Sequence, residues 1–164
     1  MTSLRELTES DLESVVDINN AGYPAVPLAT LEEIRSLYEL SSYRMAALND
    51  EGDLVGFALA MDPGADYDSE NYVFFESRFD NHLYIDRIVF ADSARGLGLG
   101  TALYEHLFDF AKTQGRTAVT CEVNLEPPNP GSLRFHRRFG FEDVDTQATK
   151  GGAVVVQLLQ APLA

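Results

Sequence analysis

Hydrophobic residues recur along this chain with two different spacings, and the spacings mark the predicted elements. Alternating or continuous apolar runs of strand length, bounded by turn residues, predict seven strands. They cover residues 4–7, 43–48, 54–61, 83–90, 118–124, 141–147 and 153–159. Apolar residues three and four positions apart predict helices. These cover residues 10–20, 30–40, 98–114 and 130–139.

Local start and stop signals support these boundaries. A Ser or Thr followed three residues later by Glu, the pattern of a capping box, opens the helices at residues 10–13 and 30–33. Asn129 before Pro130 predicts an N-cap with proline at the first helical position. The stretch at 62–81 is acidic and aromatic and is compatible with one helix. The order of elements therefore predicts a mixed α and β fold.

Length and composition predict a single domain spanning residues 1–164. No stretch approaches the roughly 20 apolar residues of a membrane span, and the N-terminus lacks the apolar core of a signal peptide. Cys121 is the single cysteine, so no internal disulfide can form. This composition fits a reducing compartment, and we expect a cytoplasmic protein that binds no membrane.

The formal net charge is −14, with acidic residues spread along the whole chain. Such a charge repels nucleic acid and anionic lipid and attracts cationic partners. The alternative is a solvated acidic surface that only keeps the protein soluble. A homodimer is compatible with the sequence.

After the predicted strand at 83–90 and a four-residue turn at 91–94 lies a stretch with glycine at every second position. It consists of Arg95, Gly96, Leu97, Gly98, Leu99, Gly100 and Thr101. Missing Cβ atoms let a ligand approach the backbone, and the N–H groups at a helix N-terminus favour negative charge. Arg95 adds a permanent cation with a fork of donors suited to phosphate oxygens. The stretch therefore predicts a diphosphate site.

Its spacing excludes two common diphosphate loops. A P-loop has Lys between its last glycine and a Ser or Thr, whereas Thr101 follows Gly100 directly. A dinucleotide fingerprint needs glycine three positions after Gly98, where Thr101 stands. The remaining pattern, R-x-x-G-x-G between a strand and a helix, resembles the pyrophosphate loop of the GNAT superfamily of acyl-CoA-dependent N-acyltransferases. The alternative is a turn that only lets the strand and the helix pack closely.

A second motif and the order of elements extend this resemblance. Residues 129–141, NPGSLRFHRRFGF, are similar to a late motif of the family that runs from Asn through an aromatic-Tyr pair to Gly-Phe. The resemblance implies an α+β fold with a central, mostly antiparallel mixed sheet of six to seven strands, flanked by about four helices. It also implies a V-shaped splay between the fourth and fifth strands.

The resemblance further implies acetyl-CoA as co-substrate and assigns residues to it. Backbone groups of Ile88, Val89 and Phe90 would bind the pantetheine arm and the thioester carbonyl. Residues 95–101 would hold the pyrophosphate, and Asn129 and Ser132 match positions near the distal pantetheine. No metal is expected, because His82, His106 and Cys121 show no metal-ligand spacing.

Candidates for proton transfer come from the same motifs. His136 stands where the family usually has Tyr and could give a proton to the thiolate, either as imidazolium or by hydrogen bonding as the neutral form. The alternative is a histidine on the helix surface between arginines. Asp86 is our first candidate for the base and Glu122 the second, because each carboxylate interrupts an apolar strand. Alternatively a cation or hydroxyl satisfies each of them, or water acts as base. Arg87 should point away from Asp86, because successive strand residues alternate.

The resemblance places the acceptor near residues 20–30 and 62–81. Aromatic residues there, Tyr23, Tyr67, Tyr72 and Phe75, could form an apolar wall, and Asp66, Asp68 or Glu70 could hold an ammonium group. We expect acetyl transfer to a primary amine of a small, amino-acid-like molecule. A peptide or protein N-terminus would present the same chemistry, and the missing Tyr also allows a non-catalytic acyl-CoA-binding domain.

Overall fold

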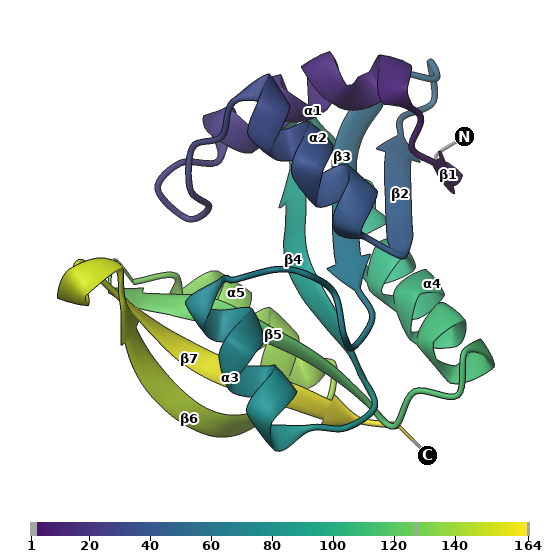
Figure 1. Ribbon diagram of the computed structural model, residues 1–164. Coiled ribbons are helices and arrows are strands. Elements are labelled where there is room, and N and C mark those ends of the chain that lie inside the picture. Colours follow the sequence, from purple (N-terminus) through teal and green to yellow (C-terminus); the bar gives the residue numbers. More distant parts are fainter. Residues whose placement is uncertain (1–2, 127, 164) are drawn as a thin grey trace. The chain divides into compact units, whose positions relative to one another are not determined.

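The computed structural model describes residues 3–126 and 128–163, and all seven expected strands form (Figure 1). The strands are β1 (Ser3–Glu6), β2 (Tyr43–Leu48), β3 (Leu54–Met61), β4 (His82–Phe90), β5 (Ala118–Glu126), β6 (Glu142–Thr149) and β7 (Val154–Pro162). The α-helices are α1 (Leu12–Ala21), α2 (Leu31–Leu40), α3 (Glu70–Arg78), α4 (Leu99–Thr113) and α5 (Pro130–Arg138). Short 3₁₀ turns are η1 (Glu9–Asp11), η2 (Asp92–Ala94) and η3 (Lys150–Gly152). Within the described residues, no helix is long and apolar enough to cross a membrane.

The chain forms two compact units, each built from two separate stretches. Residues 1–61 and 85–110 make the first unit, and residues 62–84 and 111–164 make the second. The boundary passes through β4 between Tyr84 and Ile85 and through α4 after Phe110.

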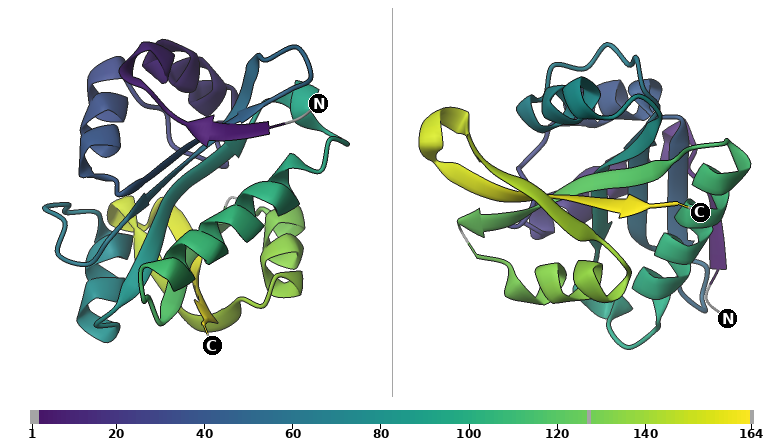
Figure 2. Two further views of the ribbon diagram at one scale, coloured as in Figure 1. Left: turned by 90° about the vertical axis from the view of Figure 1, so that its right-hand side faces the viewer. Right: turned by 90° about the horizontal axis from the view of Figure 1, so that it is seen from below.

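In the first unit, β1, β2 and β3 are neighbours in this order, followed by the part of β4 that belongs to this unit. β1 pairs with β2 and β2 with β3, both antiparallel. Helices α1 and α2 lie over one face of β2 and β3, and the first unit's part of α4 lies on the other face (Figures 1 and 2). Buried residues on both faces of β2 and β3 form the core, among them Phe57 on one face and Ala58 and Met45 on the other.

In the second unit, the start of β4 is followed in the sheet by β5, β7 and β6. β4 and β5 are parallel, and their register runs from His82↔Ala118 to Tyr84↔Thr120. β7 pairs antiparallel with both β5 and β6. Helices α3 and α5 lie on opposite faces of these strands (Figure 1). The expected mixed, mostly antiparallel sheet with flanking helices is confirmed.

The expected capping box at residues 10–13 is wrong, because the helical segment begins earlier. Thr8 is the N-cap, and its N–H donates to the Asp11 carboxylate at 2.8 Å. Arg5 on β1 donates to both oxygens of Asp11, at 2.8 and 3.0 Å. These contacts lower the pKa of Asp11 to about 2. The capping box is thus formed by Thr8 and Asp11, and a cation six residues away holds the same carboxylate.

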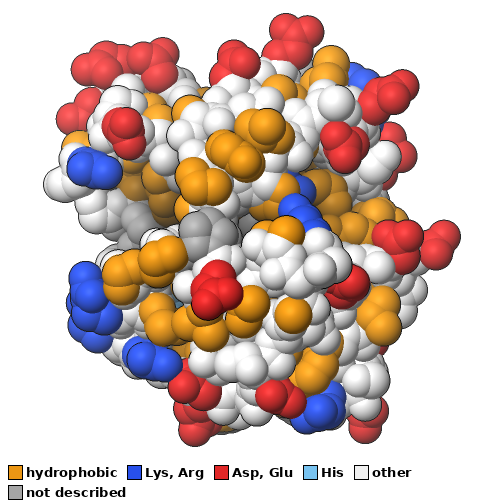
Figure 3. Space-filling model, turned by 90° about the vertical axis from the view of Figure 1, so that its left-hand side faces the viewer, with side chains coloured by type: hydrophobic (Ala, Val, Ile, Leu, Met, Phe, Trp, Pro, Cys, Tyr) orange, Lys and Arg blue, Asp and Glu red, His pale blue; other side chains and the backbone are white. Residues whose placement is uncertain are grey.

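Other local predictions hold, with small shifts at the ends. Thr30 caps α2: its hydroxyl accepts from the Glu33 N–H at 3.1 Å, and Glu33 accepts from the Thr30 N–H at 3.0 Å. Asn129 lies at the N-cap position of α5, although its side chain makes no cap hydrogen bond. Acidic side chains are spread over the face shown in Figure 3 rather than gathered in one place. That distribution fits a solvated acidic surface.

Candidate active site

The glycine-rich stretch forms an exposed loop that leads into α4. Gly96 and Gly98 have φ angles of +77° and +72°, a region that L side chains rarely adopt. A Cβ atom at either position would meet nothing within 4 Å, so the backbone conformation, and not crowding, requires glycine here. The open space beside both residues is where a ligand could reach the backbone.

The helix that follows supplies the donors. The Ala102 N–H donates to the Gly98 carbonyl at 3.2 Å, which is the first turn of the helix. The N–H groups of Leu99, Gly100 and Thr101 precede it, and the first N–H groups of a helix have no partner within that helix. Leu99 is buried and anchors this end of the helix in the core. The predicted anion site would therefore lie at the start of α4, and its ligand stays a prediction.

Arg95 is available to such an anion. Its side chain is 88% exposed and lies 3.9 Å from the carboxylate of Asp92, which is itself fully exposed. An exposed pair at that distance stabilises the fold little, since water screens it. The guanidinium can therefore turn to phosphate oxygens without breaking a buried contact.

The end of β4 packs its side chains into the first unit. The ring of Phe90 lies directly against Gly56 of β3, where a Cβ atom would clash with the ring. Val89 is buried, and its Cγ1 lies 3.1 Å from the position of a Cβ on Gly22 at the end of α1. Ile88 is half-buried. Side chains at 89 and 90 are therefore fixed by the core, so the backbone is the part of this strand that a ligand could use.

Asp86 forms an ion pair with its neighbour, contrary to expectation. The Arg87 Nε donates to Asp86 Oδ2 at 3.2 Å, and the side chains of Arg87 and Asp86 are 12% and 5% exposed. Strand alternation separates the Cβ atoms, but the long arginine side chain turns back to reach the carboxylate. This contact favours the alternative in which a cation satisfies Asp86.

The same guanidinium makes contacts that strand spacing does not predict. Arg87 Nη1 donates to Asn19 Oδ1 at 3.0 Å and to the carbonyl of Pro27 at 3.2 Å. Asn19 is completely buried. The sequence did indicate that Asn19 would be buried, because Asn19 continues the apolar stripe of Leu12 and Val15 along α1.

Glu122, in the second unit, also has a partner. The Tyr84 hydroxyl donates to Glu122 Oε1 at 2.8 Å. Tyr84 is completely buried, and its ring contacts that of Tyr72 edge-on at 5.3 Å between centroids. A hydroxyl on the neighbouring strand therefore fixes one carboxylate oxygen, as the alternative for this residue supposed.

His136 is buried, with 7% of its surface exposed, so the alternative of a surface histidine is wrong. Its ring lies edge-on to Phe141, with 5.2 Å between centroids. Nδ1 is 2.7 Å from the carbonyl oxygen of Ser132. Because a carbonyl only accepts, Nδ1 carries the proton, and the neutral ring has its lone pair on Nε2. Burial lowers the pKa of His136, against an opposing effect of the Ser132 hydrogen bond.

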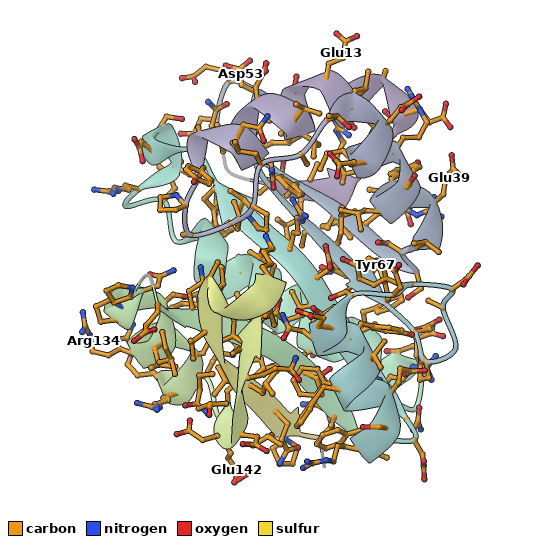
Figure 4. All side chains as sticks on the ribbon, turned by 60° about the vertical axis from the view of Figure 1, so that its left-hand side comes forward. Glu13, Glu39, Asp53, Tyr67, Arg134 and Glu142 are labelled. Atoms are coloured by element: carbon orange, nitrogen blue, oxygen red, sulfur yellow. The ribbon has the colours of Figure 1, made fainter. Side chains whose placement is uncertain are left out.

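The remaining residues of the late motif lie around the start of α5. Asn129 and Ser132 are both half-buried, and the Ser132 hydroxyl lies 3.3 Å from His136 Nδ1. Arg134 projects outward from α5 (Figure 4). Arg137 is exposed and binds Asp143 at 2.9 Å. The predicted residues are thus divided between the units: Asp86, Ile88 to Phe90 and residues 95–101 belong to the first, and Glu122, Asn129, Ser132 and His136 to the second.

Several expected acceptor residues have other roles. Tyr72 and Phe75 are buried in the second unit and belong to its core, so they form no exposed wall. The Tyr72 hydroxyl donates to the Asp62 carbonyl at 2.7 Å. Glu70 accepts the Lys150 N–H at 3.1 Å. Across residues 3–126 and 128–163, no group of three His, Cys, Asp or Glu side chains could hold a metal ion.

The chain is similar to known acetyltransferases in sequence. A spermine/spermidine N(1)-acetyltransferase from Bacillus subtilis is 26% identical over 149 residues, which cover 85% of this chain and 87% of that protein. A probable N-acetyltransferase, san, from Drosophila melanogaster is 36% identical over 76 residues. That match covers 43% of this chain and spans 40% of the relative's length.

The fold also occurs in solved acetyltransferase structures. A GNAT superfamily phosphinothricin acetyltransferase (Pat) from Sinorhizobium meliloti, in complex with AcCoA, has a TM-score of 0.76 and 22% identity. The alignment covers 99% of this chain and 89% of that one. Residues 9–141 match the acetyltransferase (GNAT) family over most of the chain. The chain therefore belongs to the GNAT family, and the protein is an acyltransferase enzyme.

Proposed function

We propose that the protein is an N-acetyltransferase that moves an acetyl group from acetyl-CoA to a primary amine of a small or amino-acid-like molecule. The observation that carries this proposal is the exposed loop with positive φ at Gly96 and Gly98, which opens onto the N-terminus of α4 beside the exposed Arg95. Such a loop binds a diphosphate, and coenzyme A contains one.

In this proposal, residues 95–101 hold the diphosphate of CoA. Backbone groups of Ile88, Val89 and Phe90 bind the pantetheine arm and the thioester carbonyl, since the Val89 and Phe90 side chains are held in the core. Asn129 and Ser132 contact the distal pantetheine. Acetyl-CoA supplies an acyl group already activated as a thioester, so the protein has to supply position and proton transfer.

Two protons leave the ammonium form of the acceptor, and two residues are proposed to take them. Neutral His136 has its lone pair on Nε2, takes one proton there and becomes the imidazolium that protonates the departing thiolate. Glu122, oriented by Tyr84, takes the other and passes it to solvent. The N–C bond forms, the C–S bond breaks, and the products are the amide, the free thiol and one released proton.

Asp86 was our first candidate for the base, and its ion pair with Arg87 leads us to propose Glu122 in its place. One Asp86 oxygen accepts from a guanidinium, so this carboxylate is already engaged in an ion pair. Glu122 Oε1 accepts instead from a neutral hydroxyl. The contacts therefore support Glu122 as the proton acceptor and Asp86 as the counter-ion of Arg87.

An amine acceptor fits the charge of the protein. The net charge of −14 attracts cations, and one relative bears the name of a spermine/spermidine acetyltransferase. A peptide N-terminus is the second candidate acceptor, because it carries the same primary amine.

Thiol release from acetyl-CoA across a panel of polyamines, amino acids and peptides tests the proposal, with calorimetric CoA binding alongside. We expect turnover with small amines and weaker apparent affinity at higher salt. Turnover with peptides alone would indicate that the acceptor is a peptide N-terminus. CoA binding without turnover on any amine would instead indicate a non-catalytic acyl-CoA-binding domain.

A further inference from the structure

Arg87 joins the strand that precedes the glycine loop to the connection between α1 and α2. Its side chain is 12% exposed and donates to three oxygens. Nε reaches Asp86 Oδ2 at 3.2 Å, while Nη1 reaches Asn19 Oδ1 at 3.0 Å and the Pro27 carbonyl at 3.2 Å. A half-buried guanidinium with three acceptors on three segments is a cross-link between them.

The two asparagines at the end of α1 hold the same connection, residues 22–30. Asn19 Nδ2 donates to the Pro27 carbonyl at 2.9 Å, so this oxygen accepts from both Asn19 and Arg87. Asn20 accepts from the Ala29 N–H at 2.9 Å and donates to the Ala29 carbonyl at 3.1 Å. The far half of the connection is therefore held by side chains of α1 and β4.

The near half rests on β4 two residues further along. A Cβ on Gly22 would lie 3.1 Å from Val89 Cγ1, so the start of the connection packs directly on this strand. Arg87 and Val89 are two positions apart and therefore point to the same side of β4. One side of this strand thus touches both halves of the connection.

The connection presents apolar side chains to solvent next to these anchors. Tyr23 is 60% exposed and Leu28 is 57% exposed. Leu28 directly follows Pro27, whose carbonyl Arg87 binds. Both side chains are therefore accessible to a ligand while the backbone that carries them is anchored.

We infer that Arg87 is a positioning residue for the amine acceptor: it holds residues 22–30 in place, so that Tyr23 and Leu28 meet the acceptor beside the end of β4. The inference rests on the proposed function and deepens it. The three hydrogen bonds of Arg87 go to Asp86, Asn19 and Pro27, which lie outside the glycine loop and α4. Loss of Arg87 should therefore affect the acceptor and leave CoA binding unchanged.

The variants Arg87→Met and Arg87→Lys test this inference. Arg87→Met keeps much of the apolar stem and removes the donors, whereas Arg87→Lys keeps the charge without the fork. Arg44→Met is the matched control, because Arg44 is also half-buried in the first unit and its Nε donates to a backbone carbonyl, that of Ser41, at 2.9 Å. We expect Arg87→Met to raise the KM for the amine about tenfold or more while the Kd for CoA changes less than about twofold. Arg87→Lys should lie between Arg87→Met and the wild type, and Arg44→Met should match the wild type in both constants.

Hydrogen exchange of residues 22–30 gives a readout that needs no catalysis. Exchange there should be faster in Arg87→Met than in the wild type and in Arg44→Met, while exchange in α4 stays the same. Unchanged exchange at 22–30, or an unchanged amine KM in a folded Arg87→Met protein, would overturn the inference. A wild type that acetylates no amine would count against the proposed function instead, and exchange would still decide whether Arg87 holds the connection.

Discussion

Replacing Gly98 by alanine adds one methyl group at a backbone position with φ of +72° and nothing within 4 Å of the added carbon. The methyl group therefore has room in the protein itself, and its effects are limited to two. It strains the backbone, and it occupies the space through which a phosphate would approach the loop. The two effects can be separated by a second glycine.

Gly52, in the turn between β2 and β3, has φ of +82° and would likewise have nothing within 4 Å of an added Cβ. Alanine at either position costs about 1–2 kcal/mol of stability, because L residues disfavour left-handed backbone. For a chain of this length, that corresponds to a fall in Tm of about 2–8 °C in both variants. Stability alone should not distinguish them.

CoA binding should distinguish them clearly. A hydrogen bond to a charged group contributes about 1.5–3 kcal/mol, and about 1.4 kcal/mol is a tenfold change in affinity. Loss of one N–H to phosphate contact in Gly98→Ala should therefore raise the Kd for CoA about 10–100-fold, while Gly52→Ala keeps the wild-type Kd. Calorimetric titration of both variants, with melting curves as the folding control, makes the comparison. A folded Gly98→Ala protein with unchanged CoA affinity would refute the placement of the diphosphate.

Three further predictions concern proton transfer and pH. His136→Phe should lower kcat about a hundredfold with little change in CoA affinity. The plot of kcat against pH for this variant should also lack the acid limb that the wild type shows below pH ~6.5. Turnover at the wild-type rate in this variant would show that His136 has only a structural role. Glu122→Gln keeps an oxygen for the Tyr84 hydroxyl, so the fold should survive while kcat falls; an unchanged kcat would contradict its role as base. Burial lowers the pKa of both His82 and His136 in the folded state. In the unfolded chain a histidine has a pKa of about 6.5, so around this pH the unfolded state binds more protons than the folded state. The Tm should therefore fall as the pH drops from 7.5 to 5.5. His82→Gln should flatten that fall in a melting series, and an equally steep fall would show that other groups cause it.

The short-range features of this protein could be predicted from the sequence. Strand and helix periods, the Thr30 capping box and the glycine loop each depend on residues within a few positions of one another. Gly96 and Gly98 illustrate the reason, because the left-handed backbone angles found there are a property of glycine itself. The resemblance to the family followed from the same local motifs.

Contacts across the fold were not predictable in this way. The carboxylate of the first capping box proved to be that of Asp11, which also accepts from Arg5 on β1. The strand period predicted that Arg87 would avoid Asp86, yet the arginine stem is long enough to turn back to it. The partners of a long, flexible side chain depend on which segments the folded backbone brings within its reach.

Which side chains are buried also depended on contacts between segments that are distant in the sequence. Tyr72 and Phe75 looked suited to an apolar wall, but helix α3 turns both inward against the sheet. His136 was placed on its helix by the sequence, whereas its burial and the Ser132 bond that holds the proton on Nδ1 depend on the packing of α5 and on Phe141. The sequence by itself thus determined the elements, the left-handed glycine loop and the family, since these rest on local backbone preference and spacing. The tertiary structure decided which carboxylates are paired, which aromatic residues are core and which nitrogen of His136 carries the proton, because burial and partners exist only once distant segments meet.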